Sequence, residues 1–124
     1  MCGLCGFLTL HADTNSNTAN ATLTRMTAQL HHRGPDDSGI WHDADAQLGL
    51  GHTRLSILDL SPEGHQPMHS ADGRFVLVFN GEIYNHRALR LELEQAESGI
   101  AWRGPSDTAV LLLSLIHLSE PTRP

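Results

Sequence analysis

Long hydrophobic runs and basic residues are both scarce in this 124-residue sequence. No apolar run approaches the roughly 20 residues that a membrane-spanning helix needs, so a membrane protein is not expected. The first residues lack a basic stretch followed by an apolar core, which argues against a signal peptide and favours a cytoplasmic protein. Lys and Arg number 8 against 14 Asp and Glu, for a net charge of -6, whereas nucleic-acid binding rests largely on basic residues. The expected partner is therefore a small molecule.

Cysteine is also rare, because Cys2 and Cys5 have no second pair elsewhere in the chain. A structural zinc site needs further ligands, and the 9 histidines supply no pair at the usual spacing and a suitable distance from the cysteines. His31 and His32 are adjacent, which suits two ligands of one ion poorly. A redox Cys-x-x-Cys pair normally opens a helix after a strand rather than a chain. No metal site is expected.

The remaining composition, with 40% hydrophobic and 18% charged residues, is that of an ordinary folded chain. One domain with its own core is expected at this length. Periodicity predicts strands at 6–10, 39–42, 48–52, 55–58 and 75–79, helices at 21–30, 86–97 and from 107 onward, and loops at 14–20, 31–39 and 61–72. Strands in clusters with helices between them indicate an α+β layered domain.

Three local features sharpen this prediction. The run 75–79 is the most apolar in the first hundred residues, and Asn80 and Gly81 follow it, so a central strand ending in a turn is expected. Asn85 and Ser106 each precede a predicted helix and are of a type that commonly caps helix N-termini.

Cys2 is notable for its position, because removal of Met1 would expose a thiol and an α-amine on one residue. A small second residue such as Cys permits that removal. The amine has an ordinary pKa of about 7.7 to 8.0, so it can accept the thiol proton near neutral pH, and the nucleophile carries its own general base. The alternative is a cysteine that merely packs within a first strand.

Further chemically dense stretches follow Cys2 along the chain. They are Cys2-Gly3 with Gly6, 32–36 with Ser38-Gly39, 52–57 with Asp59, 66–68, 80–85 and 106–108. In this order they resemble the class II glutamine amidotransferases of the N-terminal-nucleophile type, most closely the glutaminase domain of glutamine-hydrolysing asparagine synthetase. One block alone would be weak evidence for the family, whereas all of the blocks in the same order are highly specific for it.

The resemblance implies a role for each matching position. Cys2 is the expected nucleophile, with Asn80 and Gly81 donating hydrogen bonds to the oxyanion. Arg54 is expected to bind the α-carboxylate of L-glutamine, and Asp107 its α-ammonium group. Backbone groups are expected to complete the pocket at Leu55, Ser56, Ile57, Leu58 and Glu82.

Each of these positions has a plainer interpretation. Asn80 and Gly81 alone would be a hairpin turn, Arg54 a solvated charge and Asp107 a helix-start acid. The loop 33–36 resembles one that orders over the nucleophile, and it also reads as an ordinary turn. His32 and His52 are expected to be hydrogen-bonded structural residues, and Cys5 a buried strand residue.

The fold implied by the resemblance is the four-layer αββα sandwich of N-terminal-nucleophile hydrolases, here in a truncated form. The glutaminase match covers residues 2–112, and Ala109 stands where the family usually has Glu. Residues 113–124 no longer follow the family and look similar to a translated sequencing adapter. A truncated sandwich would expose a sheet face and open edges.

The expected activity is hydrolysis of L-glutamine to glutamate and ammonia through a Cys2 thioester. The ammonia would serve ATP-dependent amidation of aspartate, and ATP and Mg belong to a synthetase domain that this sequence lacks, so no cofactor is expected in the chain itself. Two alternatives stay open: a non-catalytic remnant that binds glutamine weakly or does not fold alone, and the glutaminase domain of another class II amidotransferase with a different acceptor. The sequence does not decide whether the chain forms a homo-oligomer.

Overall fold

The structure of the chain is a computed structural model that describes residues 2–9, 15–56, 62–100, 102 and 104–119. Its elements follow in the order β1 (Gly3–Leu8), α1 (Ser16–Ala28), the 3-10 helix η1 (His31–Arg33), β2 (Asp37–Asp43), β3 (Leu48–Arg54), the 3-10 helix η2 (Pro62–Gly64), β4 (Met68–His69), β5 (Val76–Leu77), α2 (His86–Ala96) and α3 (Asp107–Ser119). The α+β class expected from the sequence is confirmed.

The larger sheet is antiparallel, with strand order β1-β3-β2, so β3 lies in the middle. Gly3 pairs with Thr53 across the β1–β3 ladder, and Asp37 pairs with Arg54 across the β2–β3 ladder. This register brings the start of β1 and the start of β2 to the end of β3. The start of β1 therefore lies beside the end of β3.

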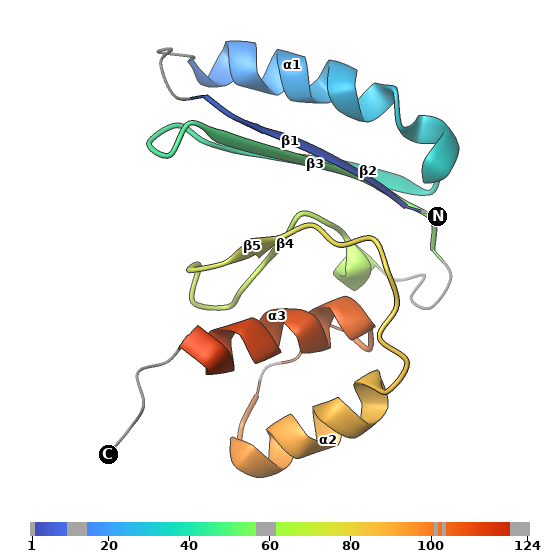
Figure 1. Ribbon diagram of the computed structural model, residues 1–124, viewed down its shortest axis with the longest axis vertical. Helices are drawn as coiled ribbons and strands as arrows, with labels where there is room; N and C mark the ends of the chain where they lie inside the picture. The colour runs from blue at the N-terminus through green and yellow to red at the C-terminus, as the bar shows by residue number, and fades with distance from the viewer. Residues whose placement is uncertain (1, 10–14, 57–61, 101, 103, 120–124) are drawn as a thin grey trace.

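Helix α1 covers one face of this sheet (Figure 1). Ala19 and Leu23 are fully buried there, because they share the helix face that points at the strands. Gly49 permits the close packing: a Cβ at this position would lie 2.7 Å from Cε1 of Phe7 and 3.0 Å from Cδ1 of Leu23.

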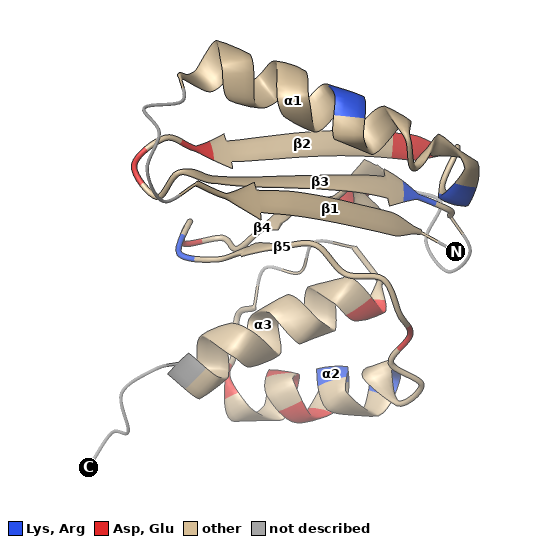
Figure 2. Ribbon diagram, turned by 45° about the horizontal axis from the view of Figure 1, so that its top comes forward, with Lys and Arg blue, Asp and Glu red and all other residues tan. Residues whose placement is uncertain are grey.

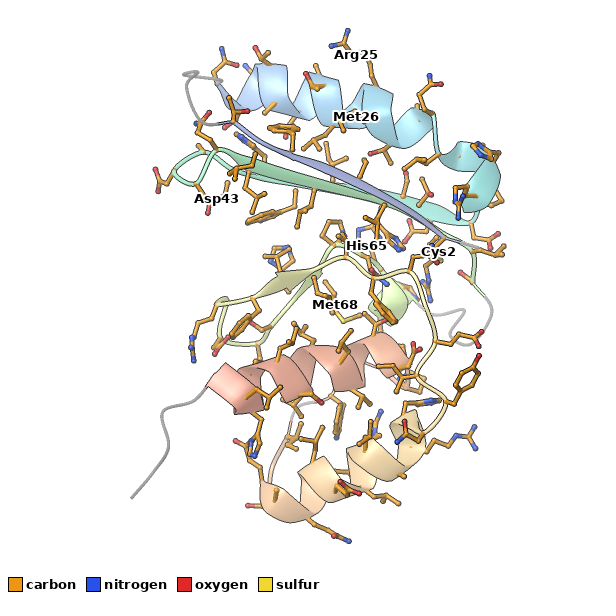
Figure 3. The ribbon with its side chains drawn as sticks, viewed as in Figure 1. Cys2, Arg25, Met26, Asp43, His65 and Met68 are labelled. Carbon is orange, nitrogen blue, oxygen red and sulfur yellow. The ribbon has the colours of Figure 1, made fainter. Side chains whose placement is uncertain are left out.

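The other face of the sheet looks toward the β4–β5 hairpin, and α3 and then α2 lie beyond it (Figure 1). Met68 of β4 lies between the hairpin and α3, where it packs with Ala109 and Leu112 (Figure 3). Phe75 and Trp102 close this second core from the sides. Along α2, which lies on the far side of α3 from the sheets, the basic residues occupy the first half and the acidic residues the second half (Figure 2).

Several boundaries differ from the sequence-based prediction. Residues 16–20 belong to α1 rather than to a loop, because the Asn15 side chain accepts a hydrogen bond from the Thr18 N–H and starts the helix there. The helix ends at Ala28 instead of residue 30. The predicted first strand lies earlier, over Gly3–Leu8, and residue 10 lies outside the described residues.

The predicted strand at 75–79 is present only at Val76–Leu77, and it is not central. The extended segment is the two-residue strand β5, which pairs with β4 in a small sheet of its own, and its side chains are half-buried. Its apolar character serves the packing against α3 instead. Of the predicted strand at 55–58, residues 55 and 56 are not in a strand, and 57 and 58 lie outside the described residues.

Two further expectations concern particular residues. Cys5 is half-buried in β1, less than expected, with its sulfur 3.6 Å from Oγ1 of Thr27. Helix α3 runs to Ser119, so residues 113–119 are helical. Among the helices that the structure describes, none is long and apolar enough to cross a membrane.

Candidate active site

A pocket of about 330 Å³ opens where the start of β1, the end of β3, the segment after β5 and the start of α3 meet. Its lining residues are Cys2, Arg54, Leu55, Ser56, Gly64, Gln66, Phe79, Asn80, Gly81, Glu82, Tyr84, Asp107 and Thr108. Most of the residues singled out from the sequence therefore share one cavity, although they come from distant parts of the chain.

Cys2 lies at the end of the sheet opposite Asp43, the last residue of β2 (Figure 3). The Leu55 N–H donates a hydrogen bond to its sulfur over 3.3 Å, and the Leu55 carbonyl oxygen lies 3.7 Å from the same sulfur. Arg33 Nε donates to the Cys2 carbonyl oxygen at 3.3 Å. The thiol is thus fixed against the residue that follows β3.

The next residue, Gly3, connects this arrangement to the turn that follows α1. Its N–H donates to Oγ1 of Thr53 at 3.2 Å, and that hydroxyl donates to the Leu30 carbonyl at 3.1 Å. Thr53 is 1% exposed, so both bonds are sheltered from water. The buried Thr53 side chain therefore helps to fix the position of Gly3, and with it Cys2, at the end of β3.

The loop 33–36 crosses the end of β3. A Cβ at Gly34 would lie 2.5 Å from the backbone nitrogen of Arg54, so only glycine allows this approach. Oδ2 of Asp36 accepts a hydrogen bond from the Ser56 N–H at 2.8 Å. The loop thereby positions both Arg54 and the segment beyond it.

Arg54 and Asp107 place opposite charges in the pocket lining. Arg54, the last residue of β3, is 7% exposed, and Asp107, the first residue of α3, is 5% exposed. Oδ2 of Asp107 accepts a hydrogen bond from the Ile83 N–H at 2.9 Å. Ser106 caps α3, because its Oγ accepts the Ala109 N–H at 3.2 Å, as expected from the sequence.

The segment 78–85 has no helix or strand in the structure and carries Asn80, Gly81 and Glu82, all exposed at the pocket rim. Its first part is held by two buried side chains. Gln66 Oε1 accepts the Phe79 N–H at 2.7 Å, and His52 Nε2 lies 3.2 Å from the Phe79 carbonyl oxygen.

His52 is fully buried, and burial lowers the pKa of its imidazole, although the hydrogen bond to Phe79 acts in the opposite direction. The ring is therefore held neutral near pH 7. His52 is hydrogen-bonded, as expected, and its structural role stays a prediction.

The pocket lining combines a thiol, a guanidinium group, a carboxylate and the amide groups of Asn80 and Gly81. A guanidinium and a carboxylate in one small cavity match the two charges of an α-amino acid. The thiol is the nucleophilic group of the lining. Among the described residues, no cluster of three His, Cys, Asp or Glu side chains is arranged to hold a metal ion.

Of the residues predicted from the sequence, Ile57 and Leu58 lie outside the described residues, and the others line the pocket. Sequence reasoning assigned no site role to Gln66 and Thr108, which also line it. Both stand inside the motif blocks, at 66–68 and 106–108, and that position was the available signal. Tyr84, 92% exposed at the rim, stands inside the block 80–85 and so carried the same signal.

The comparisons with known proteins show the family of the chain. The family model of the glutamine amidotransferase domain matches residues 1–121. The chain belongs to this family of class II glutamine amidotransferase domains. No solved structure gives a significant match to the chain.

Among curated proteins, the chain is similar to asparagine synthetase [glutamine-hydrolyzing] 1 of Bacillus subtilis, with 38% identity over 120 residues, covering 97% of this chain and 18% of that protein. The amidase chry2 of Gibberella zeae is 38% identical over 124 residues, covering 94% of the chain and 18% of the relative. A putative asparagine synthetase of Mycobacterium tuberculosis is 38% identical over 127 residues, covering 94% and 19%. The chain thus spans less than a fifth of the length of these relatives.

Proposed function

We propose that this chain is the glutaminase part of an asparagine-synthetase-like amidotransferase and hydrolyses L-glutamine through a thioester on Cys2. The observation that carries the proposal is the shared lining of one pocket by Cys2, Arg54, Asp107 and the Asn80-Gly81 pair. Membership of the glutamine amidotransferase domain family supports glutamine as the substrate.

Substrate recognition follows from the two charged residues. The Arg54 guanidinium binds the α-carboxylate of glutamine, and the Asp107 carboxylate binds its α-ammonium group. Asp107 keeps one oxygen engaged with the Ile83 N–H, so the ammonium approaches its other oxygen. Leu55, Ser56 and Glu82 line the rest of the pocket, and the resemblance assigns further backbone groups to Ile57 and Leu58. The glutamine side chain then extends toward Cys2.

In the first half of the reaction, the Cys2 sulfur attacks the side-chain amide carbon of glutamine, and the C–S bond forms. Removal of Met1 frees the Cys2 α-amine, which takes the thiol proton and passes it to the departing nitrogen. The carbonyl oxygen becomes an oxyanion that accepts hydrogen bonds from the Asn80 side chain and the Gly81 N–H. The C–N bond breaks, and ammonia leaves.

In the second half, water attacks the thioester carbon, and the α-amine accepts a proton from that water. The same donors stabilise the second oxyanion. The C–S bond breaks, glutamate leaves and the Cys2 thiol regains its proton. One glutamine and one water therefore give one glutamate and one ammonia, with no oxidant or metal required.

In the whole protein, we propose that the ammonia amidates aspartate in an ATP-dependent reaction at a site outside the present chain, where ATP and Mg would bind. The relatives named as glutamine-hydrolysing asparagine synthetases support this acceptor. The relative named as an amidase supports the alternative, in which the same glutaminase chemistry serves another acceptor.

We further propose that residues 2–112 form part of a four-layer αββα sandwich. The succession of α1, the larger sheet, the β4–β5 hairpin and α3 in Figure 1 supports this arrangement. Leu4 and Leu8 of β1 are 47% and 61% exposed, and further strands of the second sheet would cover them. The origin of residues 113–124 stays a prediction.

The experiment that tests the activity compares two cysteine variants by glutamate and ammonia release. Cys2→Ala is expected to abolish hydrolysis, because no other group can form the thioester. Cys5→Ala is the matched control, since Cys5 contacts Thr27 under α1 and is not in the pocket lining. Hydrolysis by a folded Cys2→Ala variant would refute the mechanism.

A further inference from the structure

The position of Asn80 and Gly81 is set from outside their own segment. Residues 78–85 lie between β5 and α2 and have no regular secondary structure, so no backbone ladder fixes them. The segment is instead attached at Phe79, directly before Asn80, and at Ile83, where Asp107 accepts the N–H. The attachment at Phe79 is the closer of the two to the oxyanion donors.

Gln66 makes the first bond at Phe79. Its Oε1 accepts the Phe79 N–H at 2.7 Å, and its Nε2 donates to Oγ1 of Thr108 at 3.5 Å. The amide orientation is chemically required, because a backbone N–H can only donate and needs the oxygen as its partner. Gln66 is 6% exposed, so water does not compete for this bond.

His52 makes the second bond. A carbonyl oxygen can only accept, so the Nε2 atom that lies 3.2 Å from the Phe79 oxygen carries the proton. Nδ1 is then the bare nitrogen, and it is buried without a hydrogen-bond partner within the described part of the chain. Burial favours a neutral ring, and the contact with the Phe79 carbonyl selects this tautomer.

The two bonds act on successive peptide planes. Gln66 holds the plane that contains the Phe79 nitrogen, and His52 holds the plane that contains the Phe79 carbonyl and the Asn80 nitrogen. Fixing both planes around one Cα fixes the φ and ψ angles there, and hence the direction in which the chain continues. The location of Asn80 and Gly81 follows from that direction.

We propose that Gln66 and His52 are positioning residues for the oxyanion donors of Asn80 and Gly81. This inference rests on the proposed glutaminase function. Neither side chain needs to touch the reacting atoms. Their effect is to keep preformed donors aimed at the developing negative charge, and a displacement of about 1 Å at such a site costs about a hundredfold in rate.

The test uses substitutions that remove one bond with little change in volume. Gln66→Met and His52→Leu each leave a Phe79 backbone group without its partner. We expect kcat for glutamine hydrolysis to fall about tenfold to a hundredfold while KM changes less than about twofold, because the lost effect is specific to the transition state. His52→Gln offers an amide N–H to the same carbonyl and is expected to restore most of kcat.

Ser70→Ala is the matched control. Ser70 is buried in the β4–β5 hairpin, where its Oγ accepts the Phe75 N–H at 3.0 Å. It is not part of the pocket lining. The variant loses a comparable side-chain bond to a backbone N–H that lies outside the segment 78–85, so it reproduces any general loss of stability. A wild-type kcat in Ser70→Ala supports the proposal. An equal fall in Ser70→Ala and Gln66→Met, or a wild-type kcat in Gln66→Met, overturns it.

A second readout does not depend on turnover. In ¹⁵N-labelled chain, Gln66→Met is expected to shift the Asn80 and Gly81 amide signals and to speed hydrogen exchange at Phe79, whereas Ser70→Ala leaves all three unchanged. Unmoved Asn80 and Gly81 signals in Gln66→Met overturn the proposal. If the wild-type chain hydrolyses no glutamine, the proposed function fails, and this readout still decides whether Gln66 positions the segment.

Discussion

The sulfur of Cys2 lies 3.3 Å from the backbone nitrogen of Leu55, whose N–H donates a hydrogen bond to it. The residue before Leu55 is Arg54, so the end of one strand holds both the proposed nucleophile and the proposed carboxylate-binding group. The distance between the Cys2 thiol and the Arg54 side chain therefore depends on the β1–β3 register, in which Gly3 pairs with Thr53.

Arg54→Lys is expected to raise KM for glutamine about tenfold to a hundredfold and to change kcat little. Lysine keeps the charge but loses the planar fork that matches a carboxylate, and a hydrogen bond to a charged group is worth about 1.5 to 3 kcal/mol. Steady-state kinetics measure the effect. The melting temperature of the variant shows whether the buried side chain still packs normally. An unchanged KM would show that Arg54 does not bind the substrate.

Asp107 has two roles that one substitution separates. Asp107→Asn keeps an oxygen that can accept the Ile83 N–H but loses the charge that attracts the α-ammonium group. We expect KM to rise about tenfold with nearly unchanged stability, whereas Asp107→Ala loses both and also lowers the melting temperature. Kinetics and thermal melting of the two variants distinguish the roles. Equal KM values for Asp107→Asn and the wild type would contradict the binding role.

The buried His52 predicts how stability depends on pH. Because its folded-state pKa lies below the unfolded value of about 6.5, the unfolded chain binds the proton more readily. The contribution of His52 to stability is therefore fully present above pH 6.5 and is lost as the pH falls through the folded-state pKa. The free energy of unfolding, measured by denaturant titration between neutral and mildly acidic pH, is expected to fall.

His52→Gln is the control for this pH dependence, since glutamine does not titrate. The His65–Asp37 pair also lies in this region and is the same in both proteins, so its contribution cancels in the difference. A decline of equal size in the variant and the wild type would show that His52 is not its source.

Helix capping gives a prediction about stability alone. Ser106→Ala is expected to lower the free energy of unfolding by about 0.5 to 2 kcal/mol, because Oγ of Ser106 caps α3 through the Ala109 N–H. Asn85 occupies the same position before α2, yet its side chain makes no capping hydrogen bond within the described residues. Asn85→Ala should therefore cost much less. Denaturant unfolding of the two variants makes the comparison, and equal losses would disprove it.

Much of the candidate site was predictable from the sequence. Cys2 carries its own signal through its position, and the ordered motif blocks point to Arg54, Asn80, Gly81 and Asp107. The pairing of β1 with β3 was not predictable, because short apolar strands fit many partners and registers. That pairing is what places Cys2 beside Leu55.

The errors in the predicted fold have similar causes. Periodicity missed the first turn of α1 because Ser16 and its neighbours are polar and exposed, and the Asn15 cap was the overlooked signal. The run 75–79 was predicted as a central strand because apolar residues gather equally in strands and at helix contacts. Its side chains pack against α3, a long-range contact that periodicity does not encode.

The supporting residues were harder to find than the reacting ones. Gln66 and His52 act on the Phe79 backbone, so their importance depends on a contact between segments 13 and 27 positions apart. A single sequence shows the residue types but not these distances. Only the structure shows that both side chains contact the Phe79 backbone.

The most direct test of the glutaminase site is the intact mass of the purified chain before and after incubation with 6-diazo-5-oxo-norleucine, an electrophile that mimics glutamine. The account predicts loss of Met1 and a single adduct on Cys2, blocked by excess L-glutamine and absent from Cys2→Ala. Retained Met1, an adduct on Cys5, or no adduct in a folded chain would contradict it.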